Sequence, residues 1–393
     1  MKISKKLMMG SMLTGAVALG MYSLNIPTDV SAMGSKPEVE AGAMTQTGDS
    51  YEATFYVAGM GGHFAKAVAT IDPGAAQPIN VTSLTKIDIG DRDSHPTHDA
   101  RIDNLDRDTM FWSTYQIDED AGGLHVGKTD LKTGEVIQDV VVDVPALATN
   151  TKSMYCASGQ SKDHFIPFTM SSKAYIDVFN KSDLKRVQRV FLEGTEGDIG
   201  APYKFYHGNT NNAMDKLLVI ANITNKDHGD YTGKVALVEL DLDEFVKGNV
   251  KVLNRNIIAG TPKTVTFRAY YSPDDSMIAA SGGDVMFLID AKTLEVIDRE
   301  SLSALDHNHD AIFTPDGKYV VATSRFKDII DLDACEDPNA PKAHEYTMDG
   351  VLKLYDVEKQ AFIGTHTSTC LSCHNEVGLE EHAVLCGLDA NFK

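Results

Sequence analysis

The same three residues open two distant segments of this chain, and both segments continue alike. His98-Asp99-Ala100 and His309-Asp310-Ala311 each precede an alternating strand pattern and then a tight turn. In a turn such as Pro315-Asp316-Gly317-Lys318, proline already has the required φ and aspartate can bond the backbone. A repeated strand unit with a histidine at its start predicts a fold in which imidazoles from separate units surround one axis.

Strand patterns separated by turns continue from Tyr51 onward, with almost no helical periodicity. Repeats of roughly 40 to 60 residues, each of four short strands, are typical of a β-propeller. Residues 51–90 supply only three strands, and the segment from His382 to Phe392 supplies a fourth, so the two chain ends share one blade and close the ring. The other blades are expected at 95–147, 150–197, 203–258, 264–300 and 306–366.

We therefore predict an all-β chain with a single propeller of six blades over residues 51–393. A count of seven follows if two blades have been merged. A two-domain β-sandwich is the structural alternative.

The first 32 residues have the pattern of a signal peptide. Three lysines among the first six residues precede an apolar run from Leu7 to Leu24, and Val30-Ser31-Ala32 supplies small residues for cleavage. A membrane anchor is the alternative, although the run is short and rich in glycine. Residues 33–50 are typical of a flexible leader. We expect export to a bacterial periplasm and no membrane span after removal of the signal.

The formal net charge of −20 argues against nucleic acid or anionic lipid as a partner, because both need a basic face. It suits docking onto a basic partner such as a small cationic electron carrier. The expected partners are a small-molecule substrate or a redox partner protein, with membership of a larger redox complex as a further option.

Placed on a propeller template, all 13 histidines except His164 map to one face, where such scaffolds carry binding sites. Several neutral imidazoles together suit copper, zinc or iron, and Asp99 and Asp310 are candidates to orient them. The alternative is that each histidine satisfies backbone groups at a strand end. The candidate metal ligands at or beside the inner-strand starts are His98, His207, His309, His95, His307 and Cys156.

Cys370-Leu371-Ser372-Cys373-His374 matches the c-type heme attachment motif. Two thiols in this spacing add to the porphyrin vinyl groups, and the adjacent imidazole reaches the iron. The motif predicts one covalent heme c, with His382, His366, His63 or Met60 as candidates for the sixth ligand. A zinc site completed by His382 and Cys386 is the main alternative, and a disulfide is another.

The turn motifs and the blade pattern resemble the superfamily of YVTN-type and cytochrome d1-type periplasmic propellers. This resemblance implies a binding site on the axis, at the mouth of the central channel. It suggests an oxidoreductase whose substrate binds at an axial metal or second heme iron, with electrons passing through the c-type heme. Tyr206 and Arg268 are the candidate catalytic residues, for proton transfer or for binding an anionic substrate. The alternatives are a non-catalytic electron-transfer or docking subunit and a heme- or metal-handling protein.

Overall fold

The computed structural model describes residues 50–146, 155–170, 173–227, 229–303, 306–326, 348–369 and 387–393. Within these ranges the chain forms six antiparallel sheets of four strands each and one short helix, α1 (Leu242–Phe245). The prediction of an all-β propeller with six four-stranded blades is confirmed. The predicted signal peptide, residues 1–32, lies outside the described residues, as does nearly all of the predicted leader.

Five blades are continuous in sequence and run outward from an innermost strand. The second blade contains β4 (Asp99–Ile102), β5 (Thr109–Ser113), β6 (Leu124–Asp130) and β7 (Val136–Val142). The third contains β8 (Tyr155–Gln160), β9 (His164–Thr169), β10 (Ile176–Asn180) and β11 (Arg186–Val190). The fourth contains β12 (Tyr203–Thr210), β13 (Lys216–Thr224), β14 (Tyr231–Asp241) and β15 (Val252–Ala259). The fifth contains β16 (Ala269–Tyr271), β17 (Met277–Ser281), β18 (Val285–Asp290) and β19 (Val296–Ser301). The sixth contains β20 (Asp306–Phe313), β21 (Tyr319–Phe326), β22 (Met348–Asp356) and β23 (Ala361–Ser368).

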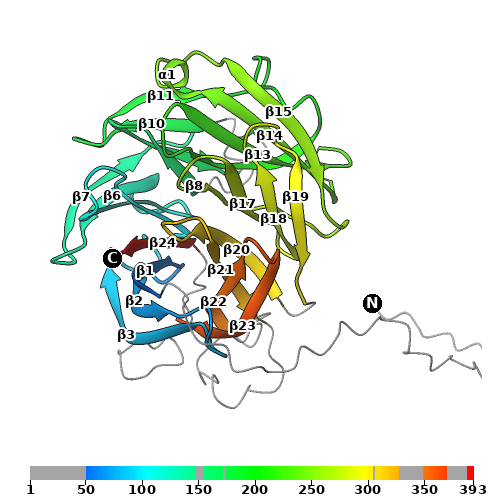
Figure 1. Cartoon of the computed structure of the whole chain (residues 1–393). Coiled ribbons are helices and arrows are strands. Elements are labelled where there is room, and N and C mark those ends of the chain that lie inside the picture. The colour runs from blue at the N-terminus through cyan, green and yellow to red at the C-terminus, as the bar shows by residue number, and fades with distance from the viewer. Residues whose placement is uncertain are drawn as a thin grey trace, which may run out of the picture. The chain divides into compact units, whose positions relative to one another are not determined.

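The first blade is built from both ends of the chain, as predicted. Its innermost strand is β24 (Gly387–Phe392), followed outward by β1 (Tyr51–Ala58), β2 (His63–Ile71) and β3 (Ile79–Asp88). The pairing of β24 with β1 runs antiparallel from Ala53 opposite Phe392 to Ala58 opposite Gly387, and Figure 1 shows the two strands side by side. The ring therefore closes through backbone hydrogen bonds, which leaves no unpaired inner edge on β1.

Neighbouring blades are joined by apolar side chains, because alternate residues of each strand face the adjoining sheets. Phe55 of the first blade packs in one buried cluster with Ile312 and Leu352 of the sixth. Phe64 of the first blade packs in another with Trp112 of the second. Fully burying one such side chain stabilises the fold by roughly 1.5–3 kcal/mol. Packing on both sides of a blade thus holds the inner strands around the axis.

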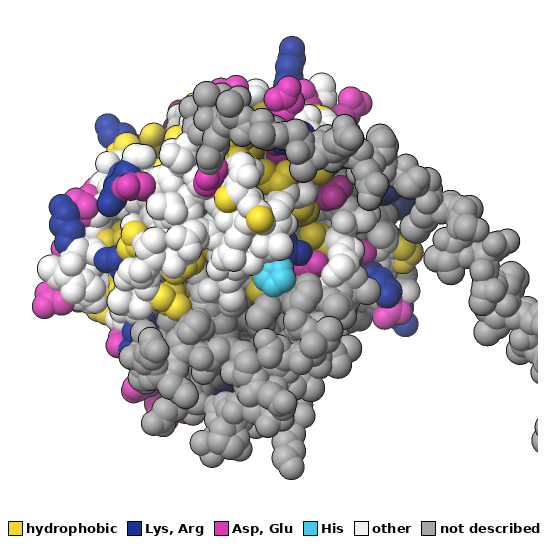
Figure 2. All heavy atoms as spheres, turned by 60° about the horizontal axis from the view of Figure 1, so that its bottom comes forward, with side chains coloured by type: hydrophobic (Ala, Val, Ile, Leu, Met, Phe, Trp, Pro, Cys, Tyr) yellow, Lys and Arg dark blue, Asp and Glu magenta, His cyan; other side chains and the backbone are white. Residues whose placement is uncertain are grey.

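The chain has 56 acidic and 36 basic residues. On the face shown in Figure 2, acidic side chains lie among Lys and Arg side chains rather than in one patch. No helix among the described residues has both the length and the apolarity to cross a membrane.

Candidate functional site

Shifts in the pairing of the inner strands determine where the side chains of several predicted site residues point. The pairing of β8 with β9 skips Cys156, and the pairing of β20 with β21 skips His309. In β12 the register shifts at Phe205, which has a φ of 44°. Such bulges redirect side chains and occur frequently next to active sites. Three of the six inner strands thus depart from regular pairing at this end of the axis.

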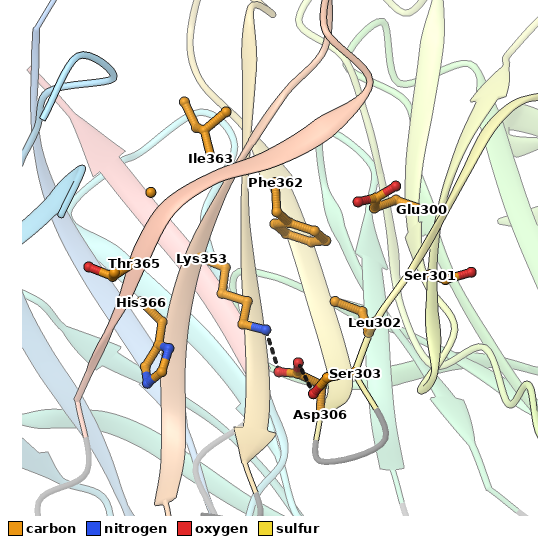
Figure 3. A pocket seen from close by; sticks show the side chains of 11 residues that line it. Glu300, Ser301, Leu302, Ser303, Asp306, Lys353, Phe362, Ile363, Thr365 and His366 are labelled. Atoms are coloured by element: carbon orange, nitrogen blue, oxygen red, sulfur yellow. Dashed lines mark hydrogen bonds and ion pairs between the residues drawn. The ribbon is translucent and has the colours of Figure 1, made fainter. Parts of the chain in front are cut away.

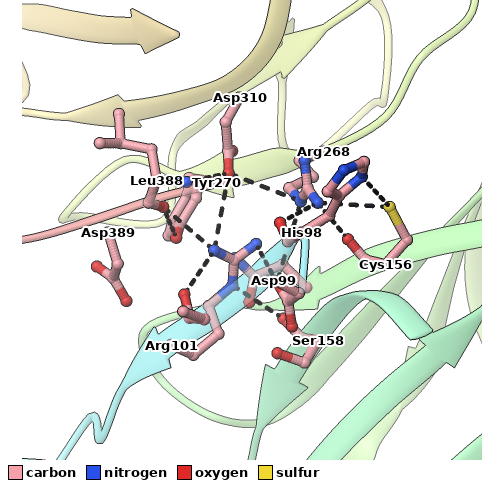
Figure 4. A network of polar contacts seen from close by, with 12 residues as sticks. His98, Asp99, Arg101, Cys156, Ser158, Arg268, Tyr270, Asp310, Leu388 and Asp389 are labelled. Atoms are coloured by element: carbon pink, nitrogen blue, oxygen red, sulfur yellow. Dashed lines mark hydrogen bonds and ion pairs between the residues drawn. The ribbon is translucent and has the colours of Figure 1, made fainter. Parts of the chain in front are cut away.

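Four buried charged side chains meet at the axis (Figure 4). Arg101 Nη2 lies 3.2 Å from Asp99 Oδ1, and Arg101 Nη1 lies 3.7 Å from Asp310 Oδ2. Arg268 Nε lies 3.8 Å from the same Asp310 oxygen and 4.0 Å from Asp99 Oδ1. The two aspartates of the repeated His-Asp-Ala motif therefore neutralise two guanidinium groups, instead of orienting neighbouring imidazoles.

This network also ties the closing strand to the ring. The backbone N–H of Leu388 in β24 donates to Asp310 Oδ2 at 2.9 Å, and Arg101 Nη1 donates to the carbonyl of Leu388 at 3.1 Å. Burial raises the pKa of Asp310, an effect that Arg101 and Arg268 oppose. Charged side chains of the second, fifth and sixth blades thus hold β24, the innermost strand of the first blade.

Arg268 joins His98 to Cys156. Its Nη2 donates to the backbone carbonyls of both residues and lies 3.4 Å from Cys156 Sγ. The same sulfur lies 3.9 Å from His98 Nδ1. Because Arg268 is fully buried and holds main-chain groups, its contacts are those of a positioning residue. They give no support to the predicted role in binding an anionic substrate.

The other two axial histidines are held by aromatic rings. The His309 ring stacks on Phe267 with centroids 4.4 Å apart, and His207 lies 5.9 Å from the same ring. His309 Nε2 lies 2.8 Å from His307 Nδ1, so one of these imidazoles donates to the other. The structure thus places His307 beside His309.

The axial imidazoles are neutral at physiological pH. Burial lowers the pKa of His207 to about 3, and the charge of Arg268 adds to this effect. Burial also lowers the pKa of His98 and of His309 well below its usual range, with the charge of Arg325 as the next cause. A neutral imidazole retains a lone pair for a metal, a proton or a ligand.

Two of these rings have a nitrogen without a partner. His98 Nε2 and His207 Nε2 are buried and make no hydrogen bond. An unsatisfied buried polar group costs about 1–3 kcal/mol, so each nitrogen calls for a partner such as a water molecule or a ligand. This is the feature of the axial site that most favours a ligand.

The described residues do not gather the predicted axial metal ligands into a chelating set. Among these residues, the one group of three or more His, Cys, Asp or Glu donor atoms within 4.8 Å of one another is His95, His125 and Asp139. His98, His207, His309 and Cys156 are not in it, and the guanidinium of Arg268 adjoins Cys156 and the carbonyl of His98. This arrangement does not fit a divalent cation at the axis. His95 belongs to the other group, a correction to its predicted place beside His98.

Tyr206 is placed away from the axial imidazoles. Its ring is part of the buried apolar cluster between the third and fourth blades and stacks on Tyr203 with centroids 4.7 Å apart. Burial is the main cause that raises the pKa of Tyr206. Since successive side chains of a strand point to opposite faces, Tyr206 faces the core when His207 faces the axis. This corrects its predicted role in proton transfer.

The predicted heme attachment segment lies outside the described residues, which stop at Thr369 and resume at Gly387. Cys370, Cys373, His374 and His382 therefore have no described position. The residues on either side, Thr369 and Gly387, do have described positions. The surroundings of Gly387 are informative. A methyl group added at Gly387 would lie 2.1 Å from the carbonyl oxygen of His98. Gly387, the first described residue after this segment, thus lies against the backbone of His98.

We expect Gly387→Ala to lower the free energy of unfolding by about 1–3 kcal/mol, the range for overpacking. The new methyl group would meet the His98 carbonyl and so displace β24 from the axis. Denaturant unfolding measures this change. Gly197→Ala is the matched control, because its new methyl group would meet first the tip of the Val250 side chain, at 2.9 Å. Equal losses in the two variants would contradict the close contact at Gly387.

A separate cavity of about 370 Å³ lies between the fifth and sixth blades. Figure 3 shows Lys353 directed toward Asp306, with Phe362 above them and His366 to the left. Lys353 Nζ and Asp306 form an ion pair, and Ser303 donates to the other oxygen of Asp306 at 2.9 Å. His366 was one candidate for the sixth heme ligand, and the structure places it on the wall of this cavity.

Comparison with known proteins gives the fold alone. No protein-family model and no curated protein matches the chain. A solved structure titled "Crystal structure of Nidogen/Laminin Complex" is similar with a TM-score of 0.52 and 11% sequence identity. The match covers 86% of this chain and 98% of that one. At this identity the likeness shows the architecture and carries no information about activity.

Proposed function

We propose that this protein is an exported, periplasmic oxidoreductase that carries one covalent heme c on a six-bladed propeller of the YVTN or cytochrome d1 type. Cys370 and Cys373 would hold the porphyrin, and His374 would ligate the iron. His382 is the candidate for the second ligand of the heme iron. When bound, the heme supplies one-electron transfer. The remaining chemistry belongs to the axial side chains.

The observation that carries this proposal is the contact between Gly387 and His98. It links the end of the segment that contains the heme motif to an axial site with two buried imidazole nitrogens that lack partners. Because the pKa of both imidazoles is lowered by burial, each ring is neutral at neutral pH and has one lone pair as well as one N–H. Such a site can exchange hydrogen bonds with a small substrate.

The described residues of the axial site have two proposed roles, substrate contact and positioning. His98 and His207 are the proposed contacts to substrate, since their Nε2 atoms have no partner in the fold. Arg268 sets the position of His98 and Cys156 through their carbonyls. The stack of His309 on Phe267 fixes the neighbouring wall.

An electron-transfer or docking subunit is the second candidate. The axial side chains are nearly completely buried, with His207 at 0% exposure and His98 at 5%, which favours a relay that meets its partner at the surface. A small basic carrier is the partner that the net charge of −20 suits. Turnover of a small nitrogen or sulfur substrate by the purified protein would favour the enzyme over this relay.

The test is a heme inventory of the full chain, expressed with its own leader in a bacterium that attaches c-type heme. We expect a pyridine hemochrome spectrum of one heme per chain that remains on the protein after acid-acetone extraction. The double variant Cys370→Ser/Cys373→Ser should abolish this covalent heme, because neither thioether can then form. Cys156→Ser should retain it, since Cys156 belongs to the axial site and not to the attachment motif. Extractable pigment or the absence of heme would overturn the proposal.

A further inference from the structure

A second group of titratable side chains lies on the second blade, apart from the Arg101–Asp310 network. His95 lies in the loop before β4, His125 lies in β6, and Asp139 lies in the outer strand β7. Their donor atoms all lie within 4.8 Å of one another. We propose that His95, His125 and Asp139 bind one divalent transition-metal ion of the zinc class.

The contacts to Asp139 define where the ion would sit. His95 Nε2 lies 3.0 Å from Asp139 Oδ2, and His125 Nδ1 lies 2.9 Å from the same oxygen. The two imidazole centroids are 4.2 Å apart. Zinc binds imidazole nitrogen and carboxylate oxygen at about 2.0–2.2 Å, so ligand atoms of a tetrahedral site lie roughly 3.3 Å apart. A small outward shift of the three side chains would therefore admit the ion.

The other nitrogen of each imidazole also has an oxygen partner. His125 Nε2 lies 3.1 Å from Asp118 Oδ2, and His95 Nδ1 lies 2.7 Å from Ser94 Oγ. The second oxygen of Asp118 accepts the backbone N–H groups of Asp120 and Ala121, which fixes that carboxylate in its loop. Metal-binding histidines almost always have such a partner on the second nitrogen, because it sets the tautomer and the ring orientation. The arrangement thus supplies the outer contacts of a metal site as well as its ligands.

The rings are held in place by close packing, and the carboxylate remains accessible. A methyl group added at Gly90 would lie 2.3 Å from the His95 ring, so only glycine leaves this space for the imidazole. Trp112 contacts the same ring edge-on at a centroid distance of 5.7 Å. The Asp139 side chain is 30% exposed, whereas His125 is 8% exposed. An ion can enter from the Asp139 side, and a water molecule can take the fourth position.

The ionisation of the group suits a cation. Burial alone would raise the pKa of Asp139, but hydrogen bonds from His125 and His95 lower it to about 2. Hydrogen bonding to Asp139 is the main cause that raises the pKa of His125. An ion would bind the lone pairs of His95 Nε2 and His125 Nδ1. Each neutral ring would then have its one proton on the other nitrogen, where it can be donated to Ser94 or Asp118.

The experiment is a zinc titration of the full chain, without a polyhistidine tag and after removal of metal with a chelator. Bound zinc is measured by mass spectrometry after gel filtration, and affinity is measured by competition with a chromogenic chelator. We expect His125→Gln and Asp139→Asn each to bind one equivalent less than the wild type. Asp118→Asn should retain the site but weaken it 10- to 100-fold, the range for loss of an outer contact.

His164→Gln is the matched control, because His164 contacts a serine but no carboxylate, and it should bind zinc as the wild type does. Heme content, measured on the same samples, should be unchanged in every variant. The proposal is overturned if the wild type binds no zinc at micromolar concentration, or if His125→Gln binds as many equivalents as the wild type. If His125→Gln fails to fold, the zinc affinity of Asp118→Asn is the test. An affinity equal to that of the wild type would also overturn the proposal.

Discussion

Asp310→Asn should lower the free energy of unfolding at neutral pH by about 3–5 kcal/mol, the cost of removing one partner from a buried ion pair. The substitution keeps the shape of the side chain and removes its charge. Asp310 Oδ2 lies 3.7 Å from Arg101 Nη1 and 3.8 Å from Arg268 Nε. Asp99 would still lie within 4.0 Å of both guanidinium groups, but one of their two described acidic partners would be gone. Water cannot solvate the uncompensated charge at this depth.

Equilibrium unfolding in urea or guanidinium chloride measures this loss. Asp108→Asn is the control, because it removes the acidic partner of Lys132 from an exposed pair. Exposed pairs contribute about 0–1 kcal/mol, so this variant should remain close to the wild type. An Asp310→Asn protein as stable as the control would show that the axial carboxylate does not stabilise the two arginines.

Acidification from pH 7 to pH 5 should cost about 2 kcal/mol of stability through His207, and His98 and His309 should add to this loss. Each is buried in the folded state, and burial lowers its pKa, to about 3 for His207. In the unfolded chain the pKa is about 6.5, so the unfolded state takes up protons first as the pH falls. This contribution is present above pH 6.5 and is lost as the pH falls toward the folded pKa. For His207 the loss over 1.5 pH units is about 2 kcal/mol.

The test compares unfolding free energies at pH 7 and pH 5 in the wild type and in His207→Phe. Phenylalanine suits a ring that already contacts Phe205 and Phe267. The variant should lose about 2 kcal/mol less than the wild type on acidification, because one titrating group is gone. His125→Gln should not reduce the loss, since the pKa of His125 is raised and its contribution disappears as the pH rises. An unchanged acid sensitivity in His207→Phe would contradict the burial argument.

The fold was accessible from sequence because each blade repeats a local signal. The alternating strands and the Pro-Asp turns mark one blade after another, and strands shared by the chain ends complete the count. The closing strand was expected within His382 to Phe392, and the structure describes it over Gly387–Phe392. Residues 382–386 lie outside the described residues.

The axial site was predictable where a residue directly precedes an inner strand. His98 and Arg268 meet at the axis for this reason. Tyr206 was misassigned because the register of β12 shifts at Phe205, and a shift of one residue exchanges the two faces of a strand. Composition could not show this local irregularity.

The group around Asp139 was missed because its residues come from a loop and two different strands and have no recognisable spacing. A signal did exist. The hairpin between β6 and β7 places Asp139 opposite Gly127, two residues from His125. Diagonal neighbours on paired strands are close enough for long side chains to meet. Reading the hairpin register would have brought His125 and Asp139 together, although the addition of His95 needs the three-dimensional fold.

Because β24 is the innermost strand of the first blade, one inner strand of the ring is translated after all the other described strands. A nascent chain that ends before Gly387 has an exposed edge on β1, and Arg101 lacks its acceptor at Leu388. Premature termination before Gly387 therefore removes the strand that closes the ring. Cys370 and Cys373 are translated before this strand, so they leave the ribosome before the ring can close.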